Sequence, residues 1–161
     1  MAGSDLAPQV LDVCKAKGLM LATVESCTGG MVVSSLVDIP GSSAVVDCGF
    51  VTYSNEAKAQ MVGVPMDLII EHGAVSEPVA RAMAEGALVH SRADLAVAIT
   101  GVAGPGGGTP EKPEGLVHFA AARKGAETVV ARIEFGALGR TEVRRRSKEQ
   151  ALKMLLDTAR S

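Results

Sequence analysis

Aromatic residues are scarce in this chain of 161 residues, which has three phenylalanines, one tyrosine and no tryptophan. An excess of one charge is also lacking, because 18 acidic residues balance 16 basic ones. Nucleic-acid binders use basic grooves and aromatic stacking platforms, so this composition argues against a nucleic-acid partner. No apolar run approaches the roughly 18 residues of a membrane span, and residues 1–10 lack the pattern of a signal peptide.

The spacing of cysteine and histidine gives no metal-binding pattern. The cysteines form no CxxC pair and the histidines no HxxxH or HExxH motif: Cys14, Cys27, Cys48, His72, His90 and His118. We therefore expect no metal site and no cofactor. Three cysteines cannot all pair within one chain, which favours a reducing cytoplasm as the location of the protein.

Apolar residues make up 47% of the sequence, enough to bury the core of a single domain over residues 1–161. Helical periodicity predicts helices at residues 6–17, capped by Asp5, and at 31–37, 55–62, 65–71, 77–91 and 142–159. Apolar and β-branched runs predict strands at residues 19–24, 44–54, 93–100, 116–123 and 128–135. The alternation of strands and helices predicts a three-layer α/β/α sandwich with a mixed, mostly parallel sheet.

Three segments with polar or glycine-rich sequences follow predicted strands, namely residues 25–30, 54–58 and 100–108. The last opens a long loop, residues 101–115, in which nine of fifteen residues are glycine or proline. Loops of this length in compact domains are usually functional or disordered. Ligands of open α/β sheets bind outside the carboxyl ends of the strands, so we expect the three segments to converge on one site.

The first two of these segments contain residues suited to acyl transfer. Ser26 and Thr28 precede Gly29-Gly30 at a predicted helix start, where unpaired N–H groups favour a phosphate or a developing oxyanion. A plain N-cap role for either hydroxyl is the alternative. Lys58 lies early in a helix, where a lysine is usually solvated, but a desolvated lysine can take a proton from a serine hydroxyl.

Other side chains are open to two interpretations. Arg140, just before the last predicted helix, either supplies a second cation that disfavours a charged Lys58 or simply flanks the helix. Tyr53 either covers the edge of the core or contacts a ligand. Cys27 is a second candidate nucleophile, although such cysteines are more often small buried hydrophobes. The run Arg144-Arg145-Arg146 is interpreted as the solvated face of the last helix.

Two common motifs are missing from the segments that follow the strands. Residues 100–108 lack the Gly-Lys-Ser/Thr end of a P-loop, which argues against GTPases and kinases. The chain also has no GxSxG elbow with plausible aspartate and histidine partners, which argues against an α/β-hydrolase triad.

Four segments, taken together, resemble one protein family. They are residues 22–30 (ATVESCTGG), 51–58 (VTYSNEAK), 73–76 (GAVS) and 100–109 (TGVAGPGGGT). In this order and spacing they resemble the CinA carboxy-terminal domain family, whose stand-alone members include nicotinamide-nucleotide amidases. The resemblance covers nearly the whole chain. It implies hydrolysis of the carboxamide of nicotinamide mononucleotide (NMN) to nicotinic acid mononucleotide and ammonia, without a metal.

The resemblance also assigns roles to individual residues. The serine nucleophile of the family falls on Ser26 and its lysine base on Lys58, and three further active-site residues fall on Tyr53, Thr100 and Arg140. Substrate contacts are expected from Thr28, Gly29, Gly30, Gly101, Gly104, Gly106 and Gly107. The chain departs from the family at Leu138-Gly139, where other members tend to have Gly-Asp or Gly-Asn before the arginine.

Two functions of another class stay open on the sequence alone. A non-catalytic nucleotide-binding module would use the same loops to hold a phosphorylated ligand without turnover. A scaffold domain would act through a self-association surface. By resemblance, we expect the chain to form a homo-oligomer. We also expect it to bind a small-molecule nucleotide as substrate.

Overall fold

The structure is a computed structural model that describes residues 6–161, so the expected Asp5 cap lies outside the described residues. The helices are α1 (Leu6–Lys17), α2 (Met31–Val37), α3 (Asn55–Val62), α4 (Met66–His72), α5 (Glu77–Val89) and α6 (Arg140–Arg160), with a short 3-10 turn at Ser42–Ala44. The strands are β1 (Leu21–Glu25), β2 (Val46–Val51), β3 (Leu95–Gly101), β4 (Leu116–Arg123) and β5 (Val129–Glu134). No helix in this part of the chain is long and apolar enough to cross a membrane.

The five strands form one mixed sheet in the order β2-β1-β3-β4-β5. Strand β1 pairs in parallel with both β2 and β3, whereas β4 pairs antiparallel with β3 and β5. Four of the five strands therefore run in the same direction. The chain leaves β1 for β2 on one side and then crosses to β3 on the other, which makes the carboxyl ends of β1 and β3 a topological switch point.

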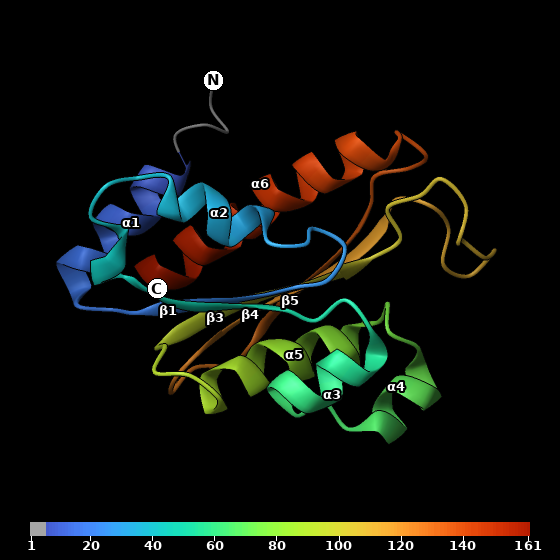
Figure 1. Ribbon diagram of the computed structural model, residues 1–161, viewed down its shortest axis with the longest axis horizontal. Coiled ribbons are helices and arrows are strands. Elements are labelled where there is room, and N and C mark those ends of the chain that lie inside the picture. Colours follow the sequence, from blue (N-terminus) through green and yellow to red (C-terminus); the bar gives the residue numbers. More distant parts are fainter. Residues whose placement is uncertain (1–5) are drawn as a thin grey trace.

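Helices cover both faces of this sheet, as Figure 1 shows. Helices α1, α2 and α6 lie on one face and α3, α4 and α5 on the other. Because the central strands are covered on both sides, alternate residues of β3 enter different cores: Val97 and Ile99 pack under α6, and Ala96 and Ala98 under α5. The predicted three-layer α/β/α sandwich is confirmed.

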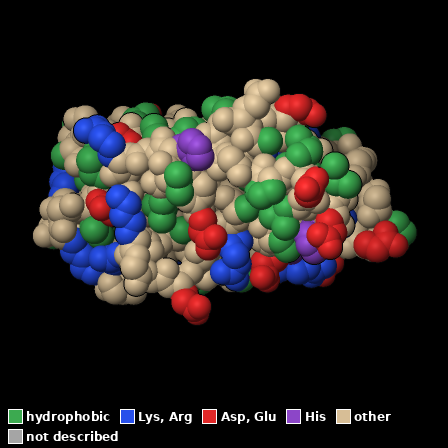
Figure 2. Space-filling view, turned by 90° about the horizontal axis from the view of Figure 1, so that it is seen from below, with side chains coloured by type: hydrophobic (Ala, Val, Ile, Leu, Met, Phe, Trp, Pro, Cys, Tyr) green, Lys and Arg blue, Asp and Glu red, His purple; other side chains and the backbone are tan. Residues whose placement is uncertain are grey.

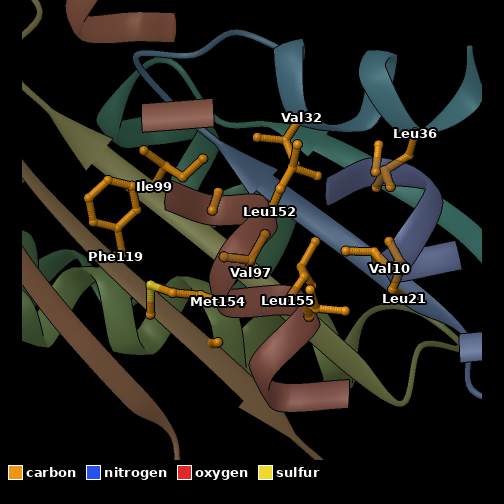
Figure 3. Packing of buried hydrophobic residues seen from close by; sticks show 14 of the residues in the cluster. Val10, Leu21, Val32, Leu36, Val97, Ile99, Phe119, Leu152, Met154 and Leu155 are labelled. Atoms are coloured by element: carbon orange, nitrogen blue, oxygen red, sulfur yellow. The ribbon is translucent and has the colours of Figure 1, made fainter. Parts of the chain in front are cut away.

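The core beneath α6 is built from large aliphatic side chains. Figure 3 shows Leu152 and Leu155 of α6 facing Val97 and Ile99 on the sheet. Burial of each such side chain stabilises the fold by about 1.5–3 kcal/mol relative to exposure. Helix α6 is thus held firmly against the sheet. The helix begins at Arg140, two residues before the predicted start.

The opposite core uses small residues, which let α5 approach its neighbours closely. A Cβ atom added at Gly86 of α5 would lie 1.9 Å from the carbonyl oxygen of Val62 at the end of α3. Helix α3 is therefore packed directly on α5 at a fixed distance. The outer surface of this layer, seen in Figure 2, mixes basic, acidic and apolar side chains.

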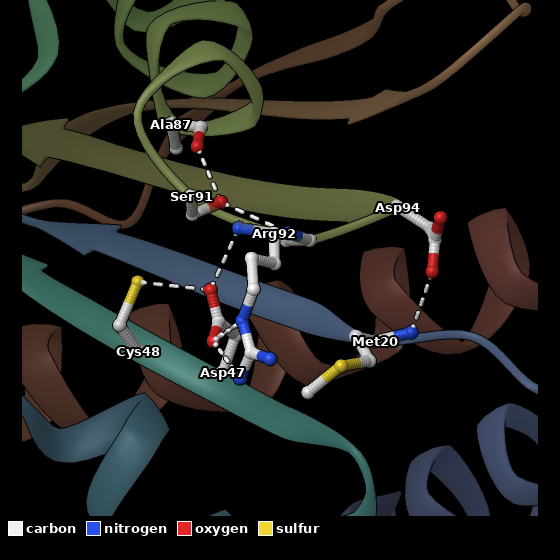
Figure 4. A network of polar contacts seen from close by, with 8 residues as sticks. Met20, Asp47, Cys48, Ala87, Ser91, Arg92 and Asp94 are labelled. Atoms are coloured by element: carbon white, nitrogen blue, oxygen red, sulfur yellow. Dashed lines mark hydrogen bonds and ion pairs between the residues drawn. The ribbon is translucent and has the colours of Figure 1, made fainter.

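Polar contacts fasten the amino ends of the strands, at the end of the sheet opposite the switch point. The Asp47 carboxylate accepts hydrogen bonds from the backbone and the guanidinium of Arg92, and Asp94 accepts one from the Met20 N–H (Figure 4). These contacts tie β2 and β1 to the segment that begins β3. The loops at the carboxyl ends are left to form a site.

Candidate active site

Ser26 lies at the switch point, directly after β1. Its N–H donates to the carbonyl of Ile99 on β3 at 3.0 Å, so the end of β3 fixes its backbone. The residue is 92% buried and lines a cleft of about 280 Å³ at the carboxyl ends of the strands. The end of a buried strand therefore places one hydroxyl at the floor of a cleft.

Lys58, on the first turns of α3, reaches this hydroxyl from the other side of the cleft. Its Nζ donates to the Ser26 Oγ at 3.4 Å and to the Thr52 carbonyl at 3.0 Å. The side chain is only 1% exposed, so the alternative of a solvated surface lysine is wrong. Burial lowers the pKa of Lys58 below its usual 10.5, which favours the neutral amine that a general base requires.

The causes of this shift correct one expectation from the sequence. One of the two interpretations of Arg140 was a nearby second cation that disfavours the charged form of Lys58. Desolvation is instead the dominant cause of the lowered pKa, with a small opposing effect from Cys27, and Arg140 is not among the causes. Burial, and not a second cation, is therefore the source of the lowered pKa of Lys58.

Arg140 instead closes the mouth of the cleft, from the first turn of α6. One guanidinium nitrogen donates to the carbonyl of Gly104 at 2.9 Å and the other to the hydroxyl of Tyr53 at 3.1 Å. The Tyr53 side chain is 64% exposed, so its ring forms part of the rim rather than of the core edge. Arg140 is thus held by two contacts although Leu138-Gly139 replaces the residues usual in the family.

Thr100 and Gly101 form the wall at the end of β3. Thr100 is buried and its hydroxyl donates to the carbonyl of Ala74 at 2.9 Å, which fixes the segment before α5 against the cleft. The cleft is lined by Ser26, Cys27, Tyr53, Asn55, Lys58, Ala74, Val75, Thr100, Gly101, Ala103 and Arg140. All five predicted catalytic residues are therefore brought together around one cavity.

Most of the predicted glycine contacts lie elsewhere. Among the glycines expected at the substrate, only Gly101 lines the cleft. Gly104 takes part through its carbonyl, which holds Arg140, and Gly106 donates its N–H to the Glu114 carboxylate at 2.7 Å. Gly107 is exposed and does not line the cleft.

The start of α2 is occupied by a carboxylate of the protein itself, which the sequence analysis missed. Glu25 is fully buried, and its oxygens accept hydrogen bonds from the Thr28 hydroxyl and from the N–H groups of Gly30, Val32 and Val33. The expectation that Gly29 and Gly30 offer free N–H groups is wrong, because the Gly29 N–H donates to the Ser26 carbonyl. An acidic residue just before a helix start was the signal for this arrangement.

Two further alternatives can be weighed on the geometry. Cys27 lines the cleft, but burial raises the pKa of its thiol to about 11, which disfavours a reactive thiolate. Asn55, Ala74, Val75 and Ala103 also line the cleft without having been singled out, although all four fall in segments that carry the family resemblance. Over residues 6–161, no cluster of three or more histidine, cysteine or acidic side chains could hold a metal ion.

Comparisons with known proteins agree with this picture. The chain is 52% identical over 150 residues to the nicotinamide-nucleotide amidohydrolase PncC of Escherichia coli strain K12. The aligned region covers 93% of this chain and 90% of that protein. It is 47% identical over 159 residues to a CinA-like protein of Akkermansia muciniphila, of which it spans only 38%. A further relative, from Symbiobacterium thermophilum, is matched over 26% of its length.

Solved structures and the family model cover nearly the whole chain. The crystal structure of the competence/damage inducible protein CihA from Agrobacterium tumefaciens matches with a TM-score of 0.96 at 46% identity, over 100% of this chain and 97% of that one. The family model of the CinA C-terminal domain matches residues 3–159. This chain therefore belongs to the CinA C-terminal domain family.

Proposed function

We propose that this protein hydrolyses the carboxamide of NMN, giving nicotinic acid mononucleotide and ammonia, with Ser26 as nucleophile and Lys58 as base. The observation that carries the proposal is the buried Lys58 Nζ, 3.4 Å from the Ser26 Oγ inside a cleft. The similarity to a protein named nicotinamide-nucleotide amidohydrolase supplies the substrate class. Hydrogen bonds of this kind are often long before substrate binds and shorten in the reacting complex.

The two residues account for every proton in the reaction. Neutral Lys58 takes the Ser26 hydroxyl proton as the Oγ bonds to the carboxamide carbon, and the lysine ammonium then protonates the departing nitrogen. The carbon–nitrogen bond breaks, ammonia leaves, and an ester to Ser26 remains. Lys58 next takes a proton from a water molecule as the water oxygen attacks the ester. It returns that proton to Ser26 when the acid product is released.

The negative charge on the tetrahedral oxygen needs donors other than those of α2. The Gly29, Gly30 and Met31 N–H groups all donate within the turn or to Glu25. Among residues 6–161, the N–H of Thr28 has no hydrogen-bond acceptor, and that of Cys27 has none outside its own residue. We propose these two as the oxyanion donors, in place of the Gly29 and Gly30 N–H groups that the sequence suggested.

Substrate binding falls to the rim of the cleft. We propose that the Tyr53 ring packs near the pyridine and that Arg140, already at the mouth, contacts the phosphate. Gly101 would allow close approach of the substrate, while Gly104 acts by holding Arg140. We do not extend substrate contact to Gly106 and Gly107, which lie exposed outside the cleft.

The test is ammonia release from NMN by the purified protein, with nicotinic acid mononucleotide identified by chromatography. Ser26→Ala and Lys58→Gln should each lower kcat/KM by more than about a thousandfold, and the double variant should lose little more, because the two residues act as one unit. Cys27→Ala is the matched control and should stay active. Activity that survives in Ser26→Ala but disappears in Cys27→Ala would transfer the nucleophile to Cys27.

Binding of NMN without turnover by the folded wild-type protein would instead favour a nucleotide-binding module. A homo-oligomer and a cytoplasmic location remain parts of the proposal. Light scattering on the purified protein tests the first, and fractionation of the producing cells tests the second. The free cysteines found in the structure are compatible with a reducing compartment.

A further inference from the structure

Helix α6 presents two arginines to the site on one face. Arg140 and Arg144 are one helical turn apart, so their side chains project in the same direction. Arg144 donates from Nε to the Cys27 carbonyl at 3.0 Å and from Nη2 to the Thr28 carbonyl at 3.3 Å. Arg145 and Arg146 instead pair with Glu142 in solvent. The interpretation of all three arginines as a solvated face is therefore wrong for Arg144.

The carbonyls that Arg144 holds determine where the neighbouring N–H groups point. A trans peptide unit is planar, with its C=O and its N–H directed to opposite sides. Because the Cys27 carbonyl faces Arg144, the Thr28 N–H of the same peptide is directed away from Arg144. The Ser26 carbonyl accepts from the Gly29 N–H at 3.1 Å, so the Cys27 N–H is likewise directed away from that bond.

These contacts hold the turn after Ser26 from two sides. A cation binds its carbonyls, and the Glu25 carboxylate binds the N–H groups that follow it. Within residues 6–161, the two N–H groups of this turn that donate to no other residue are those of Cys27 and Thr28, next to the nucleophile. A guanidinium on a carbonyl also polarises that peptide, which strengthens its N–H as a donor.

We propose that Arg144 is a positioning residue for the reaction: by binding the Cys27 and Thr28 carbonyls, it fixes the Ser26 hydroxyl and the adjacent N–H groups in their reactive arrangement. The proposal rests on the proposed function only in taking Ser26 as the nucleophile. It does not depend on which carboxamide is the substrate. Arg144 does not line the cleft, so it acts through the turn.

The test compares Arg144→Gln and Arg144→Lys with Arg145→Gln, a matched control from the same helix whose side chain pairs with Glu142. Two readouts are measured: kcat and KM for NMN, and the rate at which a fluorophosphonate probe modifies Ser26, followed by mass spectrometry. In the probe reaction the Ser26 Oγ bonds to phosphorus, fluoride leaves and the hydroxyl proton passes to Lys58. Thermal unfolding of each variant shows whether it is folded.

Arg144→Gln should lower kcat and the labelling rate by about 10- to 100-fold with little change in KM, less than the 100- to 1,000-fold typical of losing an oxyanion donor itself. Arg144→Lys, which keeps one donor group, should fall between Arg144→Gln and wild type. Arg145→Gln should behave as wild type. If Arg144→Gln does not fold, the Arg144→Lys comparison decides the question.

Equal kcat and labelling rates in Arg144 and Arg145 variants would overturn the proposal. A change confined to thermal stability or to KM would overturn it too, because the contact would then serve only the fold or the binding of substrate. A wild type that releases no ammonia from NMN, yet is labelled at Ser26 in a manner dependent on Arg144, would refute the substrate and support the positioning role. A wild type that the probe does not label would refute Ser26 and Arg144 together.

Discussion

The burial of Lys58 leads to a prediction about stability as well as catalysis. Its Nζ has two neutral hydrogen-bond partners, the Ser26 hydroxyl and the Thr52 carbonyl, and no ion-pair partner among residues 6–161. A charged ammonium in this place loses hydration without an anion to compensate for it. Lys58→Met keeps much of the length and removes the charge, so we expect it to be inactive and more stable at low pH.

The direction in which this stability difference changes with pH follows from proton linkage. Burial lowers the pKa of Lys58 in the folded protein, while in the unfolded chain it stays near 10.5. Between these two values the unfolded state binds one more proton, so the wild-type free energy of unfolding rises with pH, by at most about 1.4 kcal/mol per pH unit. Lys58→Met lacks this rise. Its advantage over wild type is therefore greatest below the folded pKa and shrinks as pH approaches 10.5.

The assay is urea unfolding of both proteins at a series of pH values from about 6.5 to 10.5. Groups other than Lys58 titrate in both proteins and cancel in the difference. Lys124→Met, which removes an exposed lysine in the turn between β4 and β5, is the matched control and should differ from wild type by a constant amount. A Lys58→Met difference that is constant, or that grows with pH, would refute the reasoning.

Two further substitutions test the elements that position the site. Glu25→Gln turns one of two accepting oxygens into a donor and leaves an N–H at the start of α2 unpaired, so urea unfolding should show a loss of about 1–3 kcal/mol. This loss should be well above that of Glu142→Gln, whose partly exposed carboxylate pairs with Arg145 and Arg146; equal losses would contradict this. Gly86→Ala should lose about 1–3 kcal/mol and much of the activity despite the higher helix propensity of alanine, since its Cβ would meet the Val62 carbonyl and displace α3. A more stable Gly86→Ala protein would show that α3 can move freely.

Local patterns were sufficient to predict most of the fold. The ranges predicted for α1, α2, α3 and β4 agree with the structure because capping residues, glycines and apolar runs mark their ends. The last helix was placed too late, since nothing at Leu138-Gly139 resembles a side-chain cap and Gly139 makes no such contact. Helix starts without a capping side chain have only weak sequence signals.

The site was predicted less completely, because its chemistry depends on contacts between distant segments. The burial of Lys58 results from the packing of α3 on α5, which its own sequence context does not show. Arg144 was hidden among three consecutive arginines. A signal was nonetheless present: once Arg140 is taken as a site residue, the helical period places Arg144, rather than its two neighbours, on the same face.

The place of Glu25 explains how a lysine can remain a base so close to an acidic residue. A carboxylate beside Lys58 would favour the ammonium and raise its pKa, which would remove the base at neutral pH. Glu25 precedes Ser26 in the sequence, yet its oxygens are bound by four donors at the start of α2. Among residues 6–161, no acidic side chain lines the cleft, whose basic side chains are those of Lys58 and Arg140. The turn after Ser26 is thus organised by a negative charge. That charge stays outside the cleft in which Lys58 must lose its proton.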